Sequence, residues 1–387
     1  MKNLHAHLLL AAAFGGLLNP IQPVLAQGSL TPPGAPGPTM VTLAQIEPRT
    51  PISGTFTITN SGSYYLTTNI NTSFFVTTGI SIQASGVTLD LNGFSIISSA
   101  NFNVEPGLGA IELGSGLSDI TILNGHIRGG ITYNSGAETY SEFGFGDGIG
   151  YTGTQPFNVR VTGVSVTGCY YYGINLGNTN STVVDSCNVQ TVEGYGIQAS
   201  CVFRSTAWQC GDNAINANVV SDCYGFSTAG DGVRSTFTAN NCYGLSSGDS
   251  IVYGIATGSA NNCYGQVTGW GGAEGNSGLS ATTATGCTGQ NASSVGLAAN
   301  VALNCYGYSS GDGGFGDNPS DCGLSAGQAQ NCYGGCYTGY GVTATVAIGC
   351  TGYTTGGGVQ YGINSTIASS CTSTGGDGGI TYKYNMP

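Results

Sequence analysis

A ten-residue segment that recurs in the second half of the chain restricts its fold more than any other feature. In each copy a Gly precedes an aliphatic residue and several small residues, and a Cys stands nine positions after the Gly. The copies without gaps are GIATGSANNC (254–263), GLSATTATGC (278–287), GLAANVALNC (296–305), GLSAGQAQNC (323–332), GVTATVAIGC (341–350) and GINSTIASSC (362–371). The step from a Cys to the next copy varies from 4 to 18 positions. A constant segment that alternates with a variable one is typical of a solenoid.

The length of the repeat and the composition indicate which kind of solenoid. The shortest period is 18 residues, as between Cys287 and Cys305, whereas helical repeats need roughly 33 and leucine-rich repeats roughly 20–29. Gly makes up 67 of 387 residues and charged residues only 7%, which excludes a helical bundle or a coiled coil. Two or three short strands with tight Gly turns fit one coil of a parallel β-helix, stacked on the next at about 4.8 Å.

The first residues have the pattern of an export signal. Lys2 precedes the apolar run LLLAAAFGGLL (8–18), and Val24-Leu25-Ala26 offers small residues for cleavage after Ala26. Residues 27–39 (QGSLTPPGAPGPT) predict an extended linker. No later segment is apolar enough to cross a membrane. We therefore expect residues 1–26 to be a signal peptide and the mature protein to be secreted or held at the cell surface.

The charge of the chain restricts its partners. Nineteen Asp and Glu stand against seven Lys and Arg, for a formal net charge of −12. This acidic balance argues against a nucleic-acid partner and against a polyanionic glycan. After signal cleavage His126 is the sole histidine, so a Ser-His-Asp triad cannot use any other base.

Three stretches resemble those of known proteins: TPPGAPGPTMVTLAQIEPRTPI, SGSYYLTTNI and GISIQASGVTLDLNGFSI; ITILNGHIRGG is likewise similar to a common early β-helix coil. They are similar to secreted right-handed parallel β-helix proteins of the pectate-lyase-like superfamily, and more closely to a group of uncharacterised bacterial exported proteins. The resemblance implies a fold and export, but no reaction. We predict an all-β chain forming a single-stranded right-handed parallel β-helix of roughly ten or more coils over residues 40–387. Residues 40–100 would form N-terminal capping coils, and 173–371 the Cys-containing repeats.

Ten cysteines occupy the repeat position and would form one inward column if the coils stack. They are Cys187, Cys210, Cys223, Cys242, Cys263, Cys287, Cys305, Cys332, Cys350 and Cys371. Either a disulfide ladder or a column of buried thiols fits an exported protein. Strands about 4.8 Å apart hold Cβ atoms farther apart than the roughly 3.8 Å of a disulfide, which favours thiols. No CxxC pair indicates a zinc site.

A second column follows the first, because a Tyr comes directly after five of these cysteines. The residues are Tyr224, Tyr243, Tyr264, Tyr306 and Tyr333. An Asn often precedes the Cys, as at Asn241 and Asn262. With Cys pointing inward, strand alternation predicts that these neighbours point outward. Such a stripe could bind sugar rings of a polysaccharide or cell-surface glycan, or it could be an external ladder of like side chains.

Two further groups of residues are weaker candidates for a functional site. Asp312, Asp317 and Asp321 lie in a Gly-rich stretch that could hold Ca²⁺, although Asp between glycines is first a turn residue. Asp119, His126, Arg128 and Asp147 come closest to the carboxylate, His and basic set of a glycan-cleaving enzyme.

Taken together, these residues favour an exported scaffold that binds carbohydrate or serves a structural role, with no cofactor other than Ca²⁺. The alternative is a hydrolase or lyase that acts on a weakly charged polysaccharide.

Overall fold

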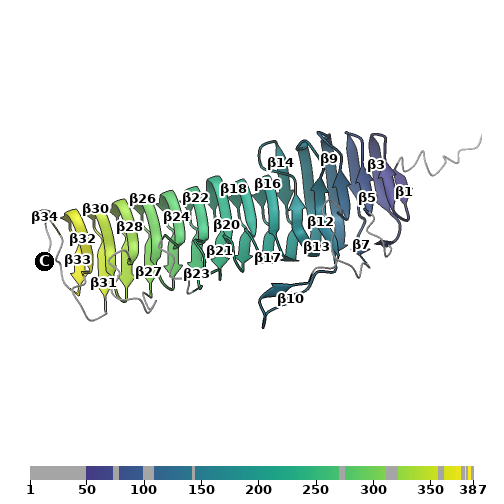
Figure 1. Cartoon of the computed structure of the whole chain (residues 1–387). Helices are drawn as coiled ribbons and strands as arrows, with labels where there is room; N and C mark the ends of the chain where they lie inside the picture. Colours follow the sequence, from purple (N-terminus) through teal and green to yellow (C-terminus); the bar gives the residue numbers. More distant parts are fainter. Residues whose placement is uncertain are drawn as a thin grey trace, which may run out of the picture. The chain divides into compact units, whose positions relative to one another are not determined.

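Short parallel strands make up the part of the chain that the structure describes. The computed structural model describes residues 49–387 except 73–77, 99–108, 142–143, 270–274, 311–320, 356–360, 376–379, 381 and 385–387. No helix occurs in these residues, and the strands form a parallel β-solenoid of about 13 turns. Figure 1 shows successive coils side by side from β1 (Thr50–Ile52) to β34 (Tyr382–Tyr384). The predicted all-β parallel β-helix is confirmed. The predicted signal peptide and linker lie outside the described residues.

The early coils enclose large aliphatic side chains. They comprise β2 (Phe56–Ile58), β3 (Gly62–Leu66), β4 (Ile70–Thr72), β5 (Ile80–Ile82), β6 (Val87–Asp90), β7 (Ser95–Ser98), β8 (Ile111–Leu113), β9 (Ser118–Arg128), β12 (Phe145–Tyr151) and β13 (Phe157–Asn175). The first of these coils contain three strands each, whereas in the coils of β9 and β13 one long strand takes the place of the second and third strands. Leu66, Ile82 and Leu89 are fully buried there. A small antiparallel hairpin, β10 (Tyr133–Asn134) with β11 (Thr139–Tyr140), extends from this region (Figure 1).

After β14 (Thr182–Asp185), long and short strands alternate along the chain. The long strands are β16 (Tyr195–Phe203), β18 (Ile215–Ser221), β20 (Val233–Asn240), β22 (Tyr253–Asn261), β24 (Ser277–Thr285), β26 (Val295–Leu303), β28 (Cys322–Gln330), β30 (Tyr340–Ile348) and β32 (Ile363–Ser369). The short strands are β15 (Asn188–Val192), β17 (Thr206–Cys210), β19 (Tyr224–Ser227), β21 (Tyr243–Ser246), β23 (Tyr264–Val267), β25 (Thr288–Asn291), β27 (Tyr306–Ser309), β29 (Tyr333–Cys336), β31 (Thr351–Thr354) and β33 (Thr372–Thr374). Long strands pair with long strands and short with short.

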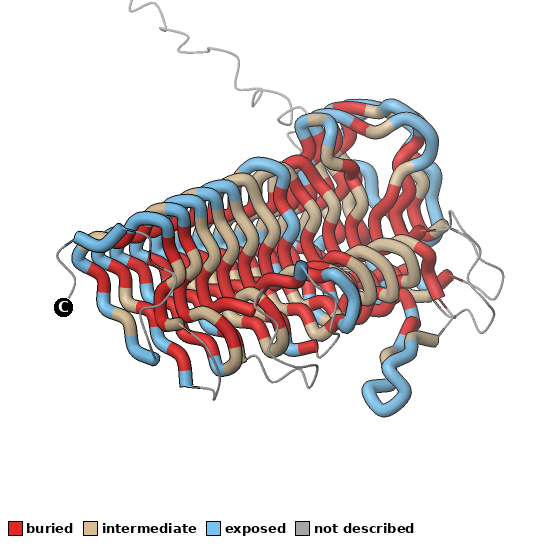
Figure 2. The backbone as a smooth tube through the Cα atoms, turned by 60° about the vertical axis from the view of Figure 1, so that its left-hand side comes forward, coloured by how far each residue is buried: buried red, intermediate tan, exposed pale blue. Residues whose placement is uncertain are grey.

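The interior of these later coils is thin and combines a column of larger aliphatic residues, such as Leu279 and Leu297, with small residues. Figure 2 shows buried positions following the strands from coil to coil. A methyl group added to Gly265 or Gly289 would lie 2.1 or 2.2 Å from the carbonyl oxygen of Gly278 or Gly296. The short strand therefore touches the start of a long strand backbone to backbone. This contact explains why Gly recurs in both strands.

A corner precedes each short strand. The corner residue takes a positive φ, 51° at both Asn241 and Asn262 and 56° at Asp222, a region that Asn and Asp tolerate better than most residues. These side chains are exposed, as predicted, although the cause is the left-handed corner and not strand alternation.

The inward Cys column is present, with one exception. Nine of the ten predicted members directly precede a short strand and are buried. Cys210 lies instead at the end of β17, and Ser205 occupies the column position of that coil. The amide of Cys187 donates to Ser205 Oγ (3.1 Å), and the amide of Ser205 contacts Cys223 Sγ (3.5 Å). The assignment of Cys210 to the column was wrong, because pairing register and not residue type decides which position a coil supplies. All fourteen cysteines are free thiols.

Candidate functional site

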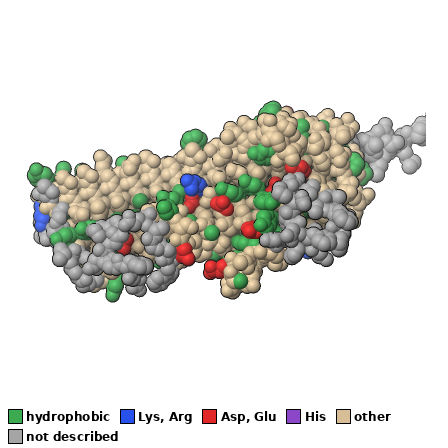
Figure 3. All heavy atoms as spheres, in the orientation of Figure 1, with side chains coloured by type: hydrophobic (Ala, Val, Ile, Leu, Met, Phe, Trp, Pro, Cys, Tyr) green, Lys and Arg blue, Asp and Glu red, His purple; other side chains and the backbone are tan. Residues whose placement is uncertain are grey.

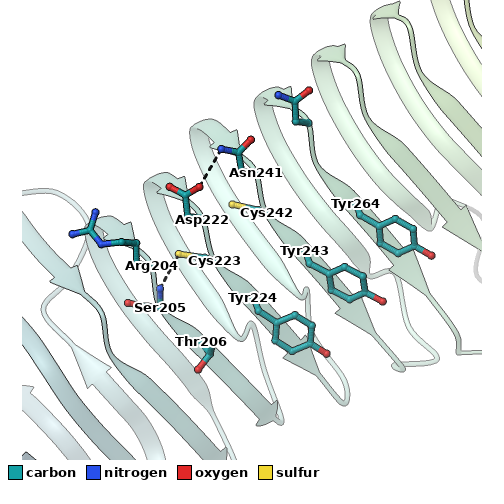
Figure 4. A pocket seen from close by; sticks show the side chains of 11 residues that line it. Arg204, Ser205, Thr206, Asp222, Cys223, Tyr224, Asn241, Cys242, Tyr243 and Tyr264 are labelled. Atoms are coloured by element: carbon teal, nitrogen blue, oxygen red, sulfur yellow. Dashed lines mark hydrogen bonds between the residues drawn. The ribbon is translucent and has the colours of Figure 1, made fainter.

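Three tyrosines at the first position of neighbouring short strands form a continuous ring stack. Tyr224, Tyr243 and Tyr264 are in register on β19, β21 and β23. Their ring centroids are 5.1 Å apart for the first pair and 4.7 Å for the second, with planes within 17° and 5° of parallel. Figure 4 shows the three rings pointing the same way from successive coils. Strand spacing therefore sets the spacing of the stack.

A second, shorter stack follows along the same column. Tyr306 and Tyr333 lie 5.3 Å apart at an angle of 6°. Thr288 separates the two stacks, since it pairs in register with Tyr264 on one side and Tyr306 on the other. The predicted tyrosine column therefore exists, but as two stacks with one coil between them.

Stacking decides which parts of each ring a ligand can reach. Both faces of Tyr243 are covered by the neighbouring tyrosines, and Trp208 stacks on Tyr224 at 5.6 Å. For Tyr224 and Tyr243, the ring edges and hydroxyls therefore remain for a ligand, whereas one face of Tyr264 has no ring of a described residue against it. The hydroxyl of Tyr264 donates to Gln290 Oε1 at 2.7 Å. Burial, and secondarily Tyr243, raises the pKa of Tyr224 to about 12, so its hydroxyl stays protonated and can donate a hydrogen bond.

An open hollow with a volume of about 490 Å³ lies between the first stack and the corner residues. Arg204, Asp222 and Asn241 lie along one border, and the tyrosines along the other (Figure 4). Asn241 Nδ2 donates to Asp222 Oδ1 at 3.0 Å, and Arg204 forms an ion pair with Asp185 at 2.6 Å. Amide groups opposite aromatic edges are suited to a neutral ligand with many hydroxyls.

The cysteine thiols at the base of this hollow are poor candidates for nucleophiles or metal ligands. Burial raises the pKa of Cys223 to about 11, so its thiolate is scarce at neutral pH. On the face of the molecule drawn in Figure 3, most side chains are uncharged, and acidic and basic side chains appear near its middle.

The four residues of the predicted catalytic set lie on two strands, β9 and β12. His126 and Arg128 are exposed on β9, while Asp119 lies at a corner, where hydrogen bonds, chiefly from Asn158, lower the pKa of its carboxyl. Asp147 is on β12. Within the described ranges, no side chain of these four hydrogen-bonds another.

Asp147 has a different acidic neighbour, Glu112 on β8. Both side chains approach Gly109: a methyl group there would lie 3.0 Å from Glu112 Oε2 and 3.4 Å from Asp147 Cβ. Glu112 is only 7% exposed, and Glu112 Oε2 and Asp147 Oδ1 are buried with no hydrogen-bond partner among the described residues. Burial raises the pKa of each carboxyl to about 7, and Glu112 adds to the effect on Asp147. Sequence reasoning missed Glu112, because no local motif connects it to Asp147.

The predicted Ca²⁺ stretch is described only at its end. Asp312 and Asp317 lie outside the described residues, and Asp321 is buried, with its carbonyl oxygen accepting a hydrogen bond from the amide of Tyr340. Among the residues that the structure describes, no group of three or more His, Cys, Asp or Glu side chains could hold a metal ion. No helix in the described ranges is long and apolar enough to span a bilayer.

Comparison with known proteins found no matching family model, no similar curated protein and no similar solved structure. The residues and their geometry are therefore the basis for a functional proposal.

Proposed function

We propose that this protein is an exported β-helix scaffold that binds a neutral polysaccharide or cell-surface glycan along its tyrosine column. The observation that carries the proposal is the in-register row of tyrosine edges facing exposed amides across an open hollow. Export rests on the signal-like residues 1–26. The same proposal includes secretion and membership of the pectate-lyase-like superfamily, both of which the sequence resemblance implies.

Two physical arguments support a neutral glycan as the ligand. Stacked rings are held by their neighbours, so little side-chain entropy is lost when a ligand contacts them. The net charge of −12 disfavours polyanions, whereas hydroxyl groups suit the phenol and amide groups of the column.

Replacing two tyrosines of the column tests this function. We expect the double variant Tyr243→Ala, Tyr264→Ala to bind neutral glycans at least about tenfold more weakly in a pull-down or array, as for aromatic anchors at other interfaces. Tyr353→Ala is the matched control, because Tyr353 is 37% exposed but lies outside the column. Equal retention by the double variant and the wild type would contradict the proposal.

A second candidate function rests on Glu112 and Asp147. Two buried carboxyls with pKa values near 7 are suited to proton transfer, and glycan hydrolysis uses such a pair. If the pair is catalytic, neutral polysaccharides should yield new reducing ends, and Asp147→Asn should abolish them while Asp119→Asn does not. Absence of product from the wild-type protein over a neutral glycan panel would exclude this candidate.

A further inference from the structure

The interruption of the tyrosine column at β25 is the feature that carries a further inference. On β27 the two outward positions are Tyr306 and Tyr308, and on β23 the first is Tyr264. On β25 the same positions hold Thr288 and Gln290, so this strand lacks an aromatic side chain between two that have one. The tyrosine column therefore has a gap one coil wide over Thr288, between Tyr264 and Tyr306, which we call the notch.

The width of this notch follows from the pairing. Tyr264 and Tyr306 are two coil steps apart, and two strand spacings amount to about 9.6 Å. Rings one step apart in the same column have centroids 4.7 to 5.3 Å apart. The notch therefore has room for one ring, placed one step from each tyrosine. Tyr264 stacks on Tyr243, and Tyr306 stacks on Tyr333, each through one face of its ring. The other face of each ring therefore borders the notch.

The base of the notch is polar and uncharged. Gln290 Oε1 accepts the Tyr264 hydroxyl at 2.7 Å, while its Nε2 and the Thr288 hydroxyl have no hydrogen-bond partner among the described residues. On the other side of Gln290 lies a separate hollow of about 170 Å³, which is lined by Gln290 and Tyr308 but not by Thr288, Tyr264 or Tyr306. Donors at the base and aromatic faces at both sides match a ring that is apolar on its faces and hydroxylated at its rim.

We propose that the notch over Thr288 binds one neutral pyranose unit, sandwiched between Tyr264 and Tyr306. The C–H groups of a pyranose contact an aromatic face at carbon–carbon distances of about 3.5–4.0 Å, which makes the ring thick enough to touch both walls. Its hydroxyls reach Thr288 and Gln290. This inference rests on the proposed function and adds a defined subsite, because at Thr288 alone in the column does a coil without an aromatic ring lie between two tyrosines, whereas the outer face of Tyr333 borders Thr351 with no second tyrosine beyond it.

The substitution Thr288→Tyr tests the notch by completing the column. The new ring would stack between Tyr264 and Tyr306, so the variant should fold at least as stably as the wild type. Thr351→Tyr is the matched control, because Thr351 holds the same column position beyond Tyr333 and has no tyrosine on its other side. Calorimetry with cellohexaose, maltohexaose and xylohexaose as probes measures the affinity of each.

We expect at least one hexasaccharide to bind the wild type and Thr351→Tyr alike, and to bind Thr288→Tyr at least about tenfold more weakly, which corresponds to about 1.4 kcal/mol. If Thr288→Tyr binds as well as the wild type while the Tyr243→Ala, Tyr264→Ala variant does not, the notch is refuted and the column function stands. Absence of binding by the wild type to all three probes would overturn the notch as a pyranose subsite. A wild-type protein that also retains no glycan in the array would overturn the column function.

Discussion

Glu112 and Asp147 should make the folded protein more stable in mild acid than above neutral pH. Burial raises the pKa of both carboxyls to about 7 from ordinary values of 4.5 and 3.8, so the folded state holds protons that the unfolded chain releases. The stabilisation is fully present below about pH 4 and is lost as the pH rises through about 7. At about 1.4 kcal/mol per unit of pKa difference, and with the effect shared by a coupled pair, we expect the free energy of unfolding to fall by about 2 kcal/mol between about pH 5 and pH 8.

Urea denaturation at a series of pH values measures this slope. The double variant Glu112→Gln, Asp147→Asn should flatten it, because neither replacement titrates. Asp119→Asn should leave it unchanged, since Asp119 is exposed and the pKa of its carboxyl is lowered, not raised. An unaltered slope in the double variant would show that other groups cause the dependence.

Individual residues also show what could be predicted from the sequence and what could not. Counting from Gly to Cys placed nine column cysteines correctly, but it selected Cys210 where Ser205 holds the position. Ser and Cys have nearly the same shape, so a buried column accepts either. Glu112 and Asp147 meet because β8 pairs with β12, which sets Glu112 beside Gly150, and the Asp147 carboxyl lies against Gly150. No local spacing in the sequence encodes that geometry.

At the scale of strands, the constant segment was predictable because its length is fixed by the coil. From Gly254 to Cys263, one long strand and one corner must be completed before the next short strand begins, so most copies keep the same length. The one extra residue between Gly232 and Cys242 is accommodated by a register shift in β20. The close approach of Gly265 to Gly278 was not predictable, because it depends on how thin the coil is across its interior. The gap at Thr288 is visible in the sequence, but only the pairing of β25 shows that tyrosines border it on both sides.

Across the whole solenoid, small residues take up more of the interior in the later coils. Ile58, Leu66 and Ile82 are among the large residues that fill the early coils. The later coils keep a column of larger aliphatic residues, such as Leu279, and fill the rest of the interior with small residues such as Ala260 and Cys263. Small side chains bury less apolar area per coil, so each later coil depends more on backbone pairing with its two neighbours. In such a one-dimensional stack, a complete coil should be removable while a partial coil should not.

Deleting residues 288–305 tests this dependence, because it removes one full 18-residue period and joins Cys287 to Tyr306. Leu279 would then stack on Leu324, as Leu297 does now, and Tyr264 would stack directly on Tyr306. We expect strand-rich circular dichroism and a single thermal unfolding transition. Deleting residues 288–296 removes half a period, shifts every buried column in the following coils and should prevent folding. Equal damage from both deletions would mean that the later coils are not interchangeable units, whereas survival of the full-coil variant alone would show that vertical register between neighbouring coils specifies the fold.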